Sequence, residues 1–421
     1  MKKIDEKVKM TREEVQNKAF ELSLEHPYMV LNYPTGLGKS YTMIKIIDHI
    51  IKNNKNYRCL ILEPETALIK NLEKEFIKFH KEYLFDNIDI LCYKSLHKVE
   101  DCYQVLVLDE AHHAFSDLRQ DLLQNLTLPK YCYLLSATIE SYQIKQFEKN
   151  QNIEFLVHKI SLKKVIEWGI LPTPKIGVFL LELNKKDINC YYEYKRGNKK
   201  EQINIVVYKE KDKWKYIKDK NKYPNICLTV YCTEEQKYNQ LCYEAETAKK
   251  RYLEDQDNEK LKDYWLYSEL CIKRFLSEIK TPYLDEFLQD VILDDNRFIV
   301  FFGSVSQAEE LAKKHKANLI ASKNEDSQNL IEKFNTKEIS NLYCCKMINE
   351  GVTLTDLEIG VIGQLDGKSG SFIQKIGRSL RSIYPQLYIF SYKDTKDETY
   401  LENALTKIDK NYVSYLDYFL V

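Results

Sequence analysis

The sequence has no excess of charge of either sign. Lysine and arginine together number 63, and aspartate and glutamate also number 63, in a chain of 421 residues. A strong overall charge would attract the whole surface to nucleic acid or to a membrane, so any site for a polyanion has to be local. Arginine, whose planar fork suits phosphate, is scarce at nine residues. Two of these nine, Arg378 and Arg381, stand close together.

The chain also lacks membrane segments and metal-binding patterns. Residues 1–14 carry too much charge for a signal peptide, and no apolar run approaches the length that spans a bilayer. The eleven cysteines form no C-x-x-C pair and have no metal-ligand spacing with histidine, so zinc is not expected at His112 or His113. We expect reduced thiols in a soluble, cytoplasmic protein with no membrane partner.

Two groups of short apolar segments predict two α/β halves. The first group lies within residues 28–160, and the second begins at residue 297. Their segments lack polar alternation, which favours parallel sheets of the doubly wound type with helices on both faces. Between them we expect a mixed β-hairpin and helical insertion. Residues 185–223 mix lysines with tyrosines and hold a turn signal at residues 196–198 between strand-like pieces, and a charged helical stretch follows. The expected divisions are a first domain at 1–160, a connector with the first strand of the second domain at 161–184, an insertion at 185–292 (β-rich in 185–223, helical in 233–292) and a second domain at 293–421.

Residues 32–40, NYPTGLGKS, are a candidate phosphate-binding loop between an apolar run and a helical-looking stretch. Gly36 and Gly38 allow consecutive N–H groups to turn toward an anion at a helix N-terminus. Lys39 would reach the β and γ phosphates, and the Ser40 hydroxyl would bind Mg²⁺. The general pattern G-x-x-x-x-G-K-[ST] requires a glycine where Tyr33 stands, so the loop alone also fits a simple strand-to-helix turn.

An acidic pair, Asp109 and Glu110, ends another apolar segment seventy positions after Lys39. The aspartate would hold Mg²⁺ directly or through water, and the glutamate would orient and deprotonate an attacking water. Alone, such a pair is commonly a helix N-cap. Following a phosphate loop at this distance, it indicates a nucleotide hydrolase.

The two motifs together resemble those of superfamily 2 helicases. In that family the loop reads P-T-G-x-G-K-[ST] without the first glycine, and the second motif reads D-E-A-H or D-E-A-D; here they are PTGLGKS and DEAHH. The absence of a glycine at Tyr33 then agrees with the family pattern. The resemblance implies two RecA-like domains and the cofactors ATP and Mg²⁺. It implies nucleotide binding by Pro34, Thr35, Gly36, Leu37, Gly38, Lys39, Ser40 and Gly351.

Further stretches resemble the remaining family motifs in the expected order. The SAT stretch would couple hydrolysis to domain movement through Ser136 and Thr138, together with His112 of DEAHH. Residues 162–176 resemble the segment that leads into the second domain. Thr353 stands where many relatives carry aspartate. The resemblance implies nucleic-acid contacts for Pro64, Thr66, Ser95, Ser304 and Thr353.

The segment FIQKIGRSLR resembles the last motif of the family. Spacings of three and four put Gln374, Arg378 and Arg381 on one side of a helix, where the plain alternative is a solvated basic face. In the family these residues act on the γ-phosphate from the second domain. Gln16 resembles the glutamine that reads adenine, although Arg12 lies one position further from it than expected; its alternative is an exposed helical residue.

We expect an ATP-dependent helicase or translocase. DEAHH, EWGILP and IQKIGRSLR look closest to DNA-repair, phage and restriction-type members, which favours single-stranded or forked DNA over RNA. An RNA helicase, or a nucleic-acid-stimulated ATPase that switches or serves as an effector subunit without unwinding, remains open. In residues 191–223, lysines and Trp214 could contact a strand by charge and stacking; the alternative is an ordinary charged β-hairpin.

Overall fold

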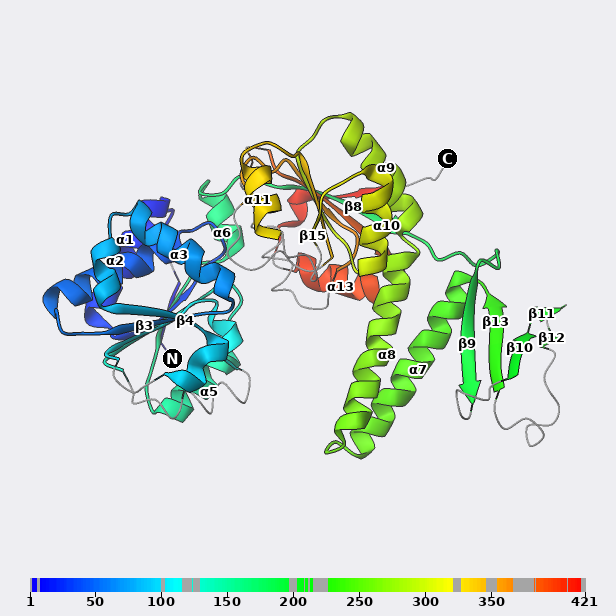
Figure 1. Ribbon diagram of the computed structural model, residues 1–421, viewed down its shortest axis with the longest axis horizontal. Helices are drawn as coiled ribbons and strands as arrows, with labels where there is room; N and C mark the ends of the chain where they lie inside the picture. The colour runs from blue at the N-terminus through cyan, green and yellow to red at the C-terminus, as the bar shows by residue number, and fades with distance from the viewer. Residues whose placement is uncertain are drawn as a thin grey trace.

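Each half of the chain folds around a seven-stranded parallel sheet in this computed structural model (Figure 1). The predicted fold class is therefore confirmed for both halves. The structure describes residues 2–5, 8–99, 103–115, 123, 129–196, 203–207, 209–210, 213–214, 226–320, 327–345, 354–365, 382, 384–406 and 408–417. Among these, no helix is both long and apolar enough to cross a bilayer.

The first sheet has the strand order β1-β7-β2-β6-β5-β3-β4. Its strands are β1 (Lys2–Asp5), β2 (Tyr28–Asn32), β3 (Cys59–Glu63), β4 (Ile88–Cys92), β5 (Val105–Leu108), β6 (Tyr131–Ser136) and β7 (Leu156–Lys159). All five residues of β3 and all four of β5 are buried, because helices cover both faces of the sheet. One face packs against α1 (Arg12–Glu25), α2 (Lys39–Asn53) and α3 (Thr66–Lys78). The other packs against α5 (Ser141–Gln151) and the short helices η2 (Tyr93–Lys98) and η3 (Ala111–Phe115); η1 (Glu82–Asp86) precedes β4.

The second sheet has the order β15-β16-β14-β17-β18-β8-β19. Its strands are β8 (Lys175–Leu181), β14 (Phe298–Phe301), β15 (Leu319–Ile320), β16 (Asn341–Cys344), β17 (Ile359–Ile362), β18 (Gln386–Tyr392) and β19 (Val413–Leu416). β8 lies between β18 and β19, so the chain enters this sheet before the insertion begins. Among its described residues, this half contains the helices α9 (Thr281–Leu293), α10 (Val305–His315), α11 (Ser327–Asn335), α13 (Lys396–Leu405) and η5 (Lys410–Tyr412).

The two halves are joined through α6 (Leu162–Glu167) and the residues after it. Leu171 packs against the phosphate loop, where one of its methyl carbons would lie 3.2 Å from a β-carbon at Gly36. Ion pairs also reach the second half, from Lys163 of the connector to Asp409 at 3.2 Å and from Lys74 of the first half to Glu332 at 3.8 Å. The connector therefore touches the candidate site directly.

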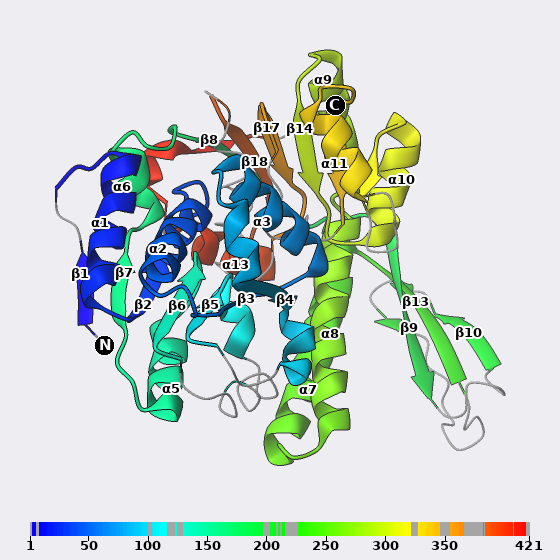
Figure 2. The same cartoon turned by 60° about the vertical axis from the view of Figure 1, so that its left-hand side comes forward.

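The insertion forms an arm, defined here as residues 190–278. A pair of long helices, α7 (Glu234–Glu254) and α8 (Glu259–Glu278), projects from the second half, and a three-stranded sheet stands on its far side from the first half (Figures 1 and 2). This sheet contains β9 (Cys190–Arg196), β10 (Ile203–Val207) and β13 (Ile226–Cys232).

The strand pairing of the arm differs from the expected hairpin. β9 pairs antiparallel with β13, and β10 pairs parallel with β13, so the two strands beside the turn signal at residues 196–198 do not pair with each other. β13 is therefore the central strand of this sheet. A short antiparallel pair is formed by β11 (Lys209–Glu210) and β12 (Lys213–Trp214).

Candidate nucleotide-binding site

The candidate phosphate loop lies between β2 and α2. Gly36 and Gly38 have φ angles of 91° and 86°, in the left-handed region that glycine adopts without strain. Gly38 is also the N-cap of α2, and a β-carbon there would collide with the side-chain amide of Gln16. The first turn of α2 holds no acidic residue. The N-terminal N–H groups and the dipole of this helix are therefore suited to an anion.

Lys39 and Glu110 approach each other beside the loop. The Lys39 ammonium donates a hydrogen bond to the Tyr33 carbonyl at 3.2 Å and lies 3.8 Å from Glu110 Oε1. The two side chains are only 10% and 14% exposed. Because water screens this pair weakly, the ammonium supplies strong positive charge at the loop.

Asp109 follows β5 directly and is half-buried among charged and polar groups. Its Oδ1 accepts a hydrogen bond from the Glu110 N–H, and its carbonyl accepts one from the Tyr93 hydroxyl, both at 2.8 Å. Burial first, and the Glu110 carboxylate second, raise the pKa of Asp109 to about 7, although Lys39 acts in the opposite direction. A divalent cation would offset this repulsion, so the donor set of hard oxygens fits Mg²⁺.

Glu110 combines an unusual backbone with an unsatisfied oxygen. Its φ angle is 40°, a conformation that costs energy in a glutamate and persists only when the surrounding structure holds it. Its Oε2 atom is buried and receives no hydrogen bond from the residues that the structure describes. A carboxylate oxygen in this state is free to accept a hydrogen bond and a proton from bound water.

His112 connects Glu110 to the end of β6. Its Nδ1 lies 3.1 Å from Ser136 Oγ and 3.7 Å from Glu110 Oε2. Ser136 Oγ also accepts a hydrogen bond from the Thr138 N–H at 3.1 Å. The three residues predicted for coupling thus form one chain of contacts beside the acidic pair.

Gln16 is buried, so it is not the exposed helical residue that was the alternative to a functional role. It lies on α1, which a capping box of Thr11 and Glu14 begins. Its side chain is 8% exposed, and its Nε2 donates a hydrogen bond to the Leu37 carbonyl at 3.1 Å. Gln16 therefore supports the phosphate loop, and its reading of adenine stays a prediction.

The residues predicted to touch nucleic acid occupy different settings. Thr66 is exposed at the start of α3, Ser95 is half-buried in η2 and Pro64 is buried. Ser304 is 7% exposed and caps α10 by accepting a hydrogen bond from the Gln307 N–H. The backbone of Trp214 belongs to β12. Gly351, Thr353, Gln374, Arg378 and Arg381 lie outside the residues that the structure describes.

Glu63 is a further acidic residue of the site, which the sequence patterns did not single out. It ends β3, and because Leu62 pairs with Leu108, Glu63 and Asp109 follow on the same face of neighbouring strands. Glu63 is 2% exposed, and its burial together with the Asp109 carboxylate raises its pKa well above its ordinary value. A glutamate closing the apolar run CLILE was the available signal. No group of three metal-ligating side chains is found in the described part of the chain.

Two family models match the chain in the order of its two halves. Residues 5–141 match the type III restriction enzyme, res subunit, and residues 280–382 match the helicase conserved C-terminal domain. The chain belongs to helicase superfamily 2. No curated protein matches its sequence.

Solved helicase structures share the fold of this superfamily 2 protein. The DEAD-box helicase Mss116, bound to ssRNA and UDP-BeF, aligns with a TM-score of 0.58 and 14% identity over 100% of this chain and 83% of that one. Dbp5 of S. cerevisiae, bound to RNA and ADP BeF3, aligns with a TM-score of 0.56 and 12% identity over 96% and 89%. The RecA-like character of the two sheets is confirmed at the level of the fold.

The raised pKa of Asp109 predicts a pH-dependent gain in stability on substitution. A pKa of about 7 in the folded state, against an ordinary value near 3.8, means that the folded protein binds more protons between these values. Asp109 therefore destabilises the fold increasingly as pH rises from about 4 to about 7. Without nucleotide and with EDTA, Asp109→Asn should raise the free energy of unfolding by about 2 kcal/mol more at pH 8 than at pH 5.

Urea unfolding at the two pH values measures this difference. Asp86→Asn is the matched control, because Asp86 is an exposed aspartate of the same domain. An equal effect of Asp109→Asn at pH 5 and pH 8 would mean that Asp109 has the same charge at both.

Proposed function

We propose that this superfamily 2 protein hydrolyses ATP with Mg²⁺ and uses the energy to move along or unwind a nucleic-acid strand, with DNA as its substrate. The observation that carries the proposal is the convergence of Lys39, Asp109 and Glu110 at one edge of the first sheet. Glu110 has a φ angle of 40°, and its Oε2 accepts no hydrogen bond from the described residues. Its Oε1 lies 3.8 Å from the Lys39 ammonium, next to a glycine loop at a helix N-terminus.

The chemistry assigned to the loop follows from its charges. The N–H groups at the start of α2 and the Lys39 ammonium would bind the β and γ phosphates of ATP. Mg²⁺, when bound, supplies charge neutralisation and orients the phosphate oxygens; Ser40 and Asp109 would hold it. Gln16 would read the adenine edge from beside the loop.

Glu110 is proposed as the base. Before nucleotide binds, Lys39 partly neutralises it across 3.8 Å. When phosphate draws the ammonium away, Glu110 Oε2 is left to accept a proton from the attacking water. His112, in contact with Ser136, would sense this change and pass it to the end of β6, where Thr138 also lies.

The second half is proposed to complete the site. Gln374, Arg378 and Arg381 would act on the γ-phosphate when the halves close, because the transferred phosphoryl group needs donors opposite the loop. Gly351 would line the nucleotide. Closure with ATP and opening after hydrolysis would then move Thr66 and Ser95 of the first half relative to Thr353 of the second along a bound strand.

The choice of DNA rests on the first-domain match to a restriction-enzyme subunit and on the resemblance of the motifs. Mss116 and Dbp5 are RNA-bound, but their low identity limits the likeness to the fold. An RNA helicase, or an ATPase that serves as a switch without unwinding, is the second candidate.

ATPase assays with a panel of nucleic acids test the substrate. We expect single-stranded and forked DNA to stimulate turnover more than RNA of the same sequence, and forked DNA to be unwound in a strand-displacement assay. Lys39→Ala, which removes the phosphate-directed charge, should abolish the activity and controls for contaminating enzymes. Stimulation by RNA alone would contradict DNA, and stimulation without displacement would favour the switch.

Separate variants of the acidic pair should separate hydrolysis from binding. Glu110→Gln keeps the shape but removes the base, so turnover should fall by about 10²–10⁴-fold while ATP still binds. Asp109→Asn should instead weaken the Mg²⁺-dependent part of ATP binding. A fluorescent ATP analogue, titrated with and without Mg²⁺, measures the binding. The same binding loss in both variants, with no separate catalytic defect, would show that these roles are wrongly assigned.

The arm is proposed to contact the strand through Trp214 and neighbouring lysines. Trp214→Ala with Lys213→Ala and Lys215→Ala should weaken DNA binding, and it should reduce the slope of log affinity against log salt by about 1–2. Basal ATPase should remain. Tyr142→Ala with Lys145→Ala and Lys149→Ala on α5 is the control, since it removes one exposed aromatic ring and two exposed lysines elsewhere. If the DNA affinity and its salt dependence are unchanged, the residues around Trp214 have only a structural role.

A further inference from the structure

Lys280 is a fully buried lysine at the root of the arm, between α8 and α9. Its side chain is 0% exposed and forms an ion pair with Asp397, itself 1% exposed, at 2.5 Å. The ammonium also donates hydrogen bonds to the Gly363 carbonyl and to Gln364 Oε1, both at 3.0 Å. An ammonium has three N–H donors, so all of them are satisfied by these three residues.

Asp397 completes the network from the start of α13. Its Oδ1 accepts a hydrogen bond from Gln364 Nε2 at 2.6 Å, and its Oδ2 accepts one from the Tyr392 N–H at 3.4 Å. Gln364 Nε2 also donates to the Leu365 carbonyl at 3.1 Å. One ion pair thus joins the root of the arm, the end of β17 and the turn after β18.

The surrounding packing leaves these elements little freedom. A β-carbon at Gly363 would lie 2.8 Å from a methyl carbon of Leu284 on α9. One at Gly303 would lie 2.6 Å from Ser277 Oγ and 2.7 Å from the Gln364 side chain. The ends of β14 and β17 therefore press directly on the junction of α8 and α9.

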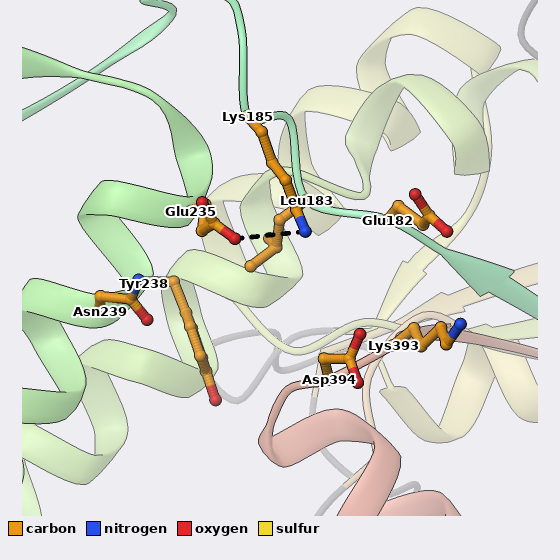
Figure 3. A pocket seen from close by; sticks show the side chains of 8 residues that line it. All are labelled: Glu182, Leu183, Lys185, Glu235, Tyr238, Asn239, Lys393 and Asp394. Carbon is orange, nitrogen blue, oxygen red and sulfur yellow. Dashed lines mark ion pairs between the residues drawn. The ribbon is translucent and has the colours of Figure 1, made fainter.

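A small polar cavity lies beside the start of α7. Its volume is about 100 Å³, and it lies between the end of β8, the start of α7 and the turn after β18 (Figure 3). The Lys185–Glu235 ion pair, at 3.3 Å, is part of its lining, which carries charges of both signs. Tyr238 lines it as well, and its hydroxyl accepts a hydrogen bond from the Lys396 N–H, next to Asp397. Because the lining carries charges of both signs, it does not select a ligand of one charge.

A buried ion pair is a poor device for stability alone. Desolvation lowers the pKa of Lys280 against the raising effect of Asp397, and apolar residues of similar volume commonly stabilise a fold as well as such a pair does. A fully hydrogen-bonded pair does fix orientation, because each bond has a preferred direction. The orientation fixed here is that of Gln364 and Leu365, from which the sequence runs into residues 366–381 with their two arginines.

We propose that Lys280 and Asp397 are positioning residues for ATP hydrolysis, which hold the end of β17 and the root of the arm in one fixed relation. The proposal rests on the proposed function, since it assigns the effect to the step that Arg378 and Arg381 serve. Breaking the network would change the position and orientation of Gln364 and Leu365, which precede the segment with Arg378 and Arg381 in the sequence. ATP binding at the loop of the first half does not depend on it.

The test is the double variant Lys280→Met with Asp397→Asn. It leaves no buried charge and keeps the side-chain shapes, while Gly363 and Gln364 lose their common donor. We expect a folded protein whose kcat with saturating DNA falls about ten-fold or more while its KM for ATP stays within about two-fold. Lys396→Met with Glu269→Gln is the matched control, because that pair also links α13 to the arm, through α8, and both of its side chains are 31% exposed. The control should keep the wild-type kcat.

Each result decides the matter. Wild-type kcat in the folded double variant overturns the proposal, as does an equal loss in the control, which would mean that only the docking of α8 on α13 matters. If the double variant does not fold, Gln364→Leu, which keeps the ion pair, replaces it: a lower kcat with unchanged KM supports positioning, and a wild-type kcat overturns it. Absence of ATPase in the unmodified protein would instead defeat the proposed function.

Discussion

The parallel pairing of β2, β6 and β5 is the constraint on which the candidate site depends. Parallel strands end at the same edge of a sheet, so the phosphate loop after β2, Ser136 at the end of β6 and Asp109 after β5 meet there. β6 lies between the other two, and His112 can therefore contact both Glu110 and Ser136. A different strand order would separate these groups, whatever their spacing in the sequence.

Charged side chains with little exposure are bonded in opposite ways at the phosphate loop and at the root of the arm. Beside the phosphate loop, Glu110 Oε2 has no hydrogen-bond donor among the described residues, and the pKa of Asp109 is raised. At the root of the arm, Lys280 and Asp397 satisfy each other together with Gln364. Unmet bonding capacity leaves room for a ligand and for proton transfer, whereas fully met capacity fixes a geometry. The site beside the phosphate loop is therefore suited to a ligand and to proton transfer, whereas the Lys280–Asp397 network is suited to holding neighbouring elements in a fixed orientation.

The local pattern of the sequence was sufficient for much of the fold and the site. Apolar runs without polar alternation determined that the strands would be buried on both faces, and the all-buried β3 and β5 agree with this. The glycines around Lys39 and the acidic pair after an apolar run marked the loop and the edge, because these features depend on residues within a few positions of each other. Gln374, Arg378 and Arg381 were also read from local spacing, and they stay predictions.

Contacts between distant segments were decided only by the tertiary structure. From the sequence, Gln16 could be an adenine-binding residue or an exposed helical residue. In the structure α1 packs beside the loop, and the Gln16 amide donates a hydrogen bond to the Leu37 carbonyl. The pairing of β13 with both β9 and β10 depends on which edges the folded arm leaves open, and no turn signal encodes that choice. The same holds for Lys280 and Asp397, since a charged residue in a sequence is ordinarily read as exposed. Periodicity determines which face of an element is buried, but the partner on the other side of that face is set by the shape and hydrogen bonding of the assembled core.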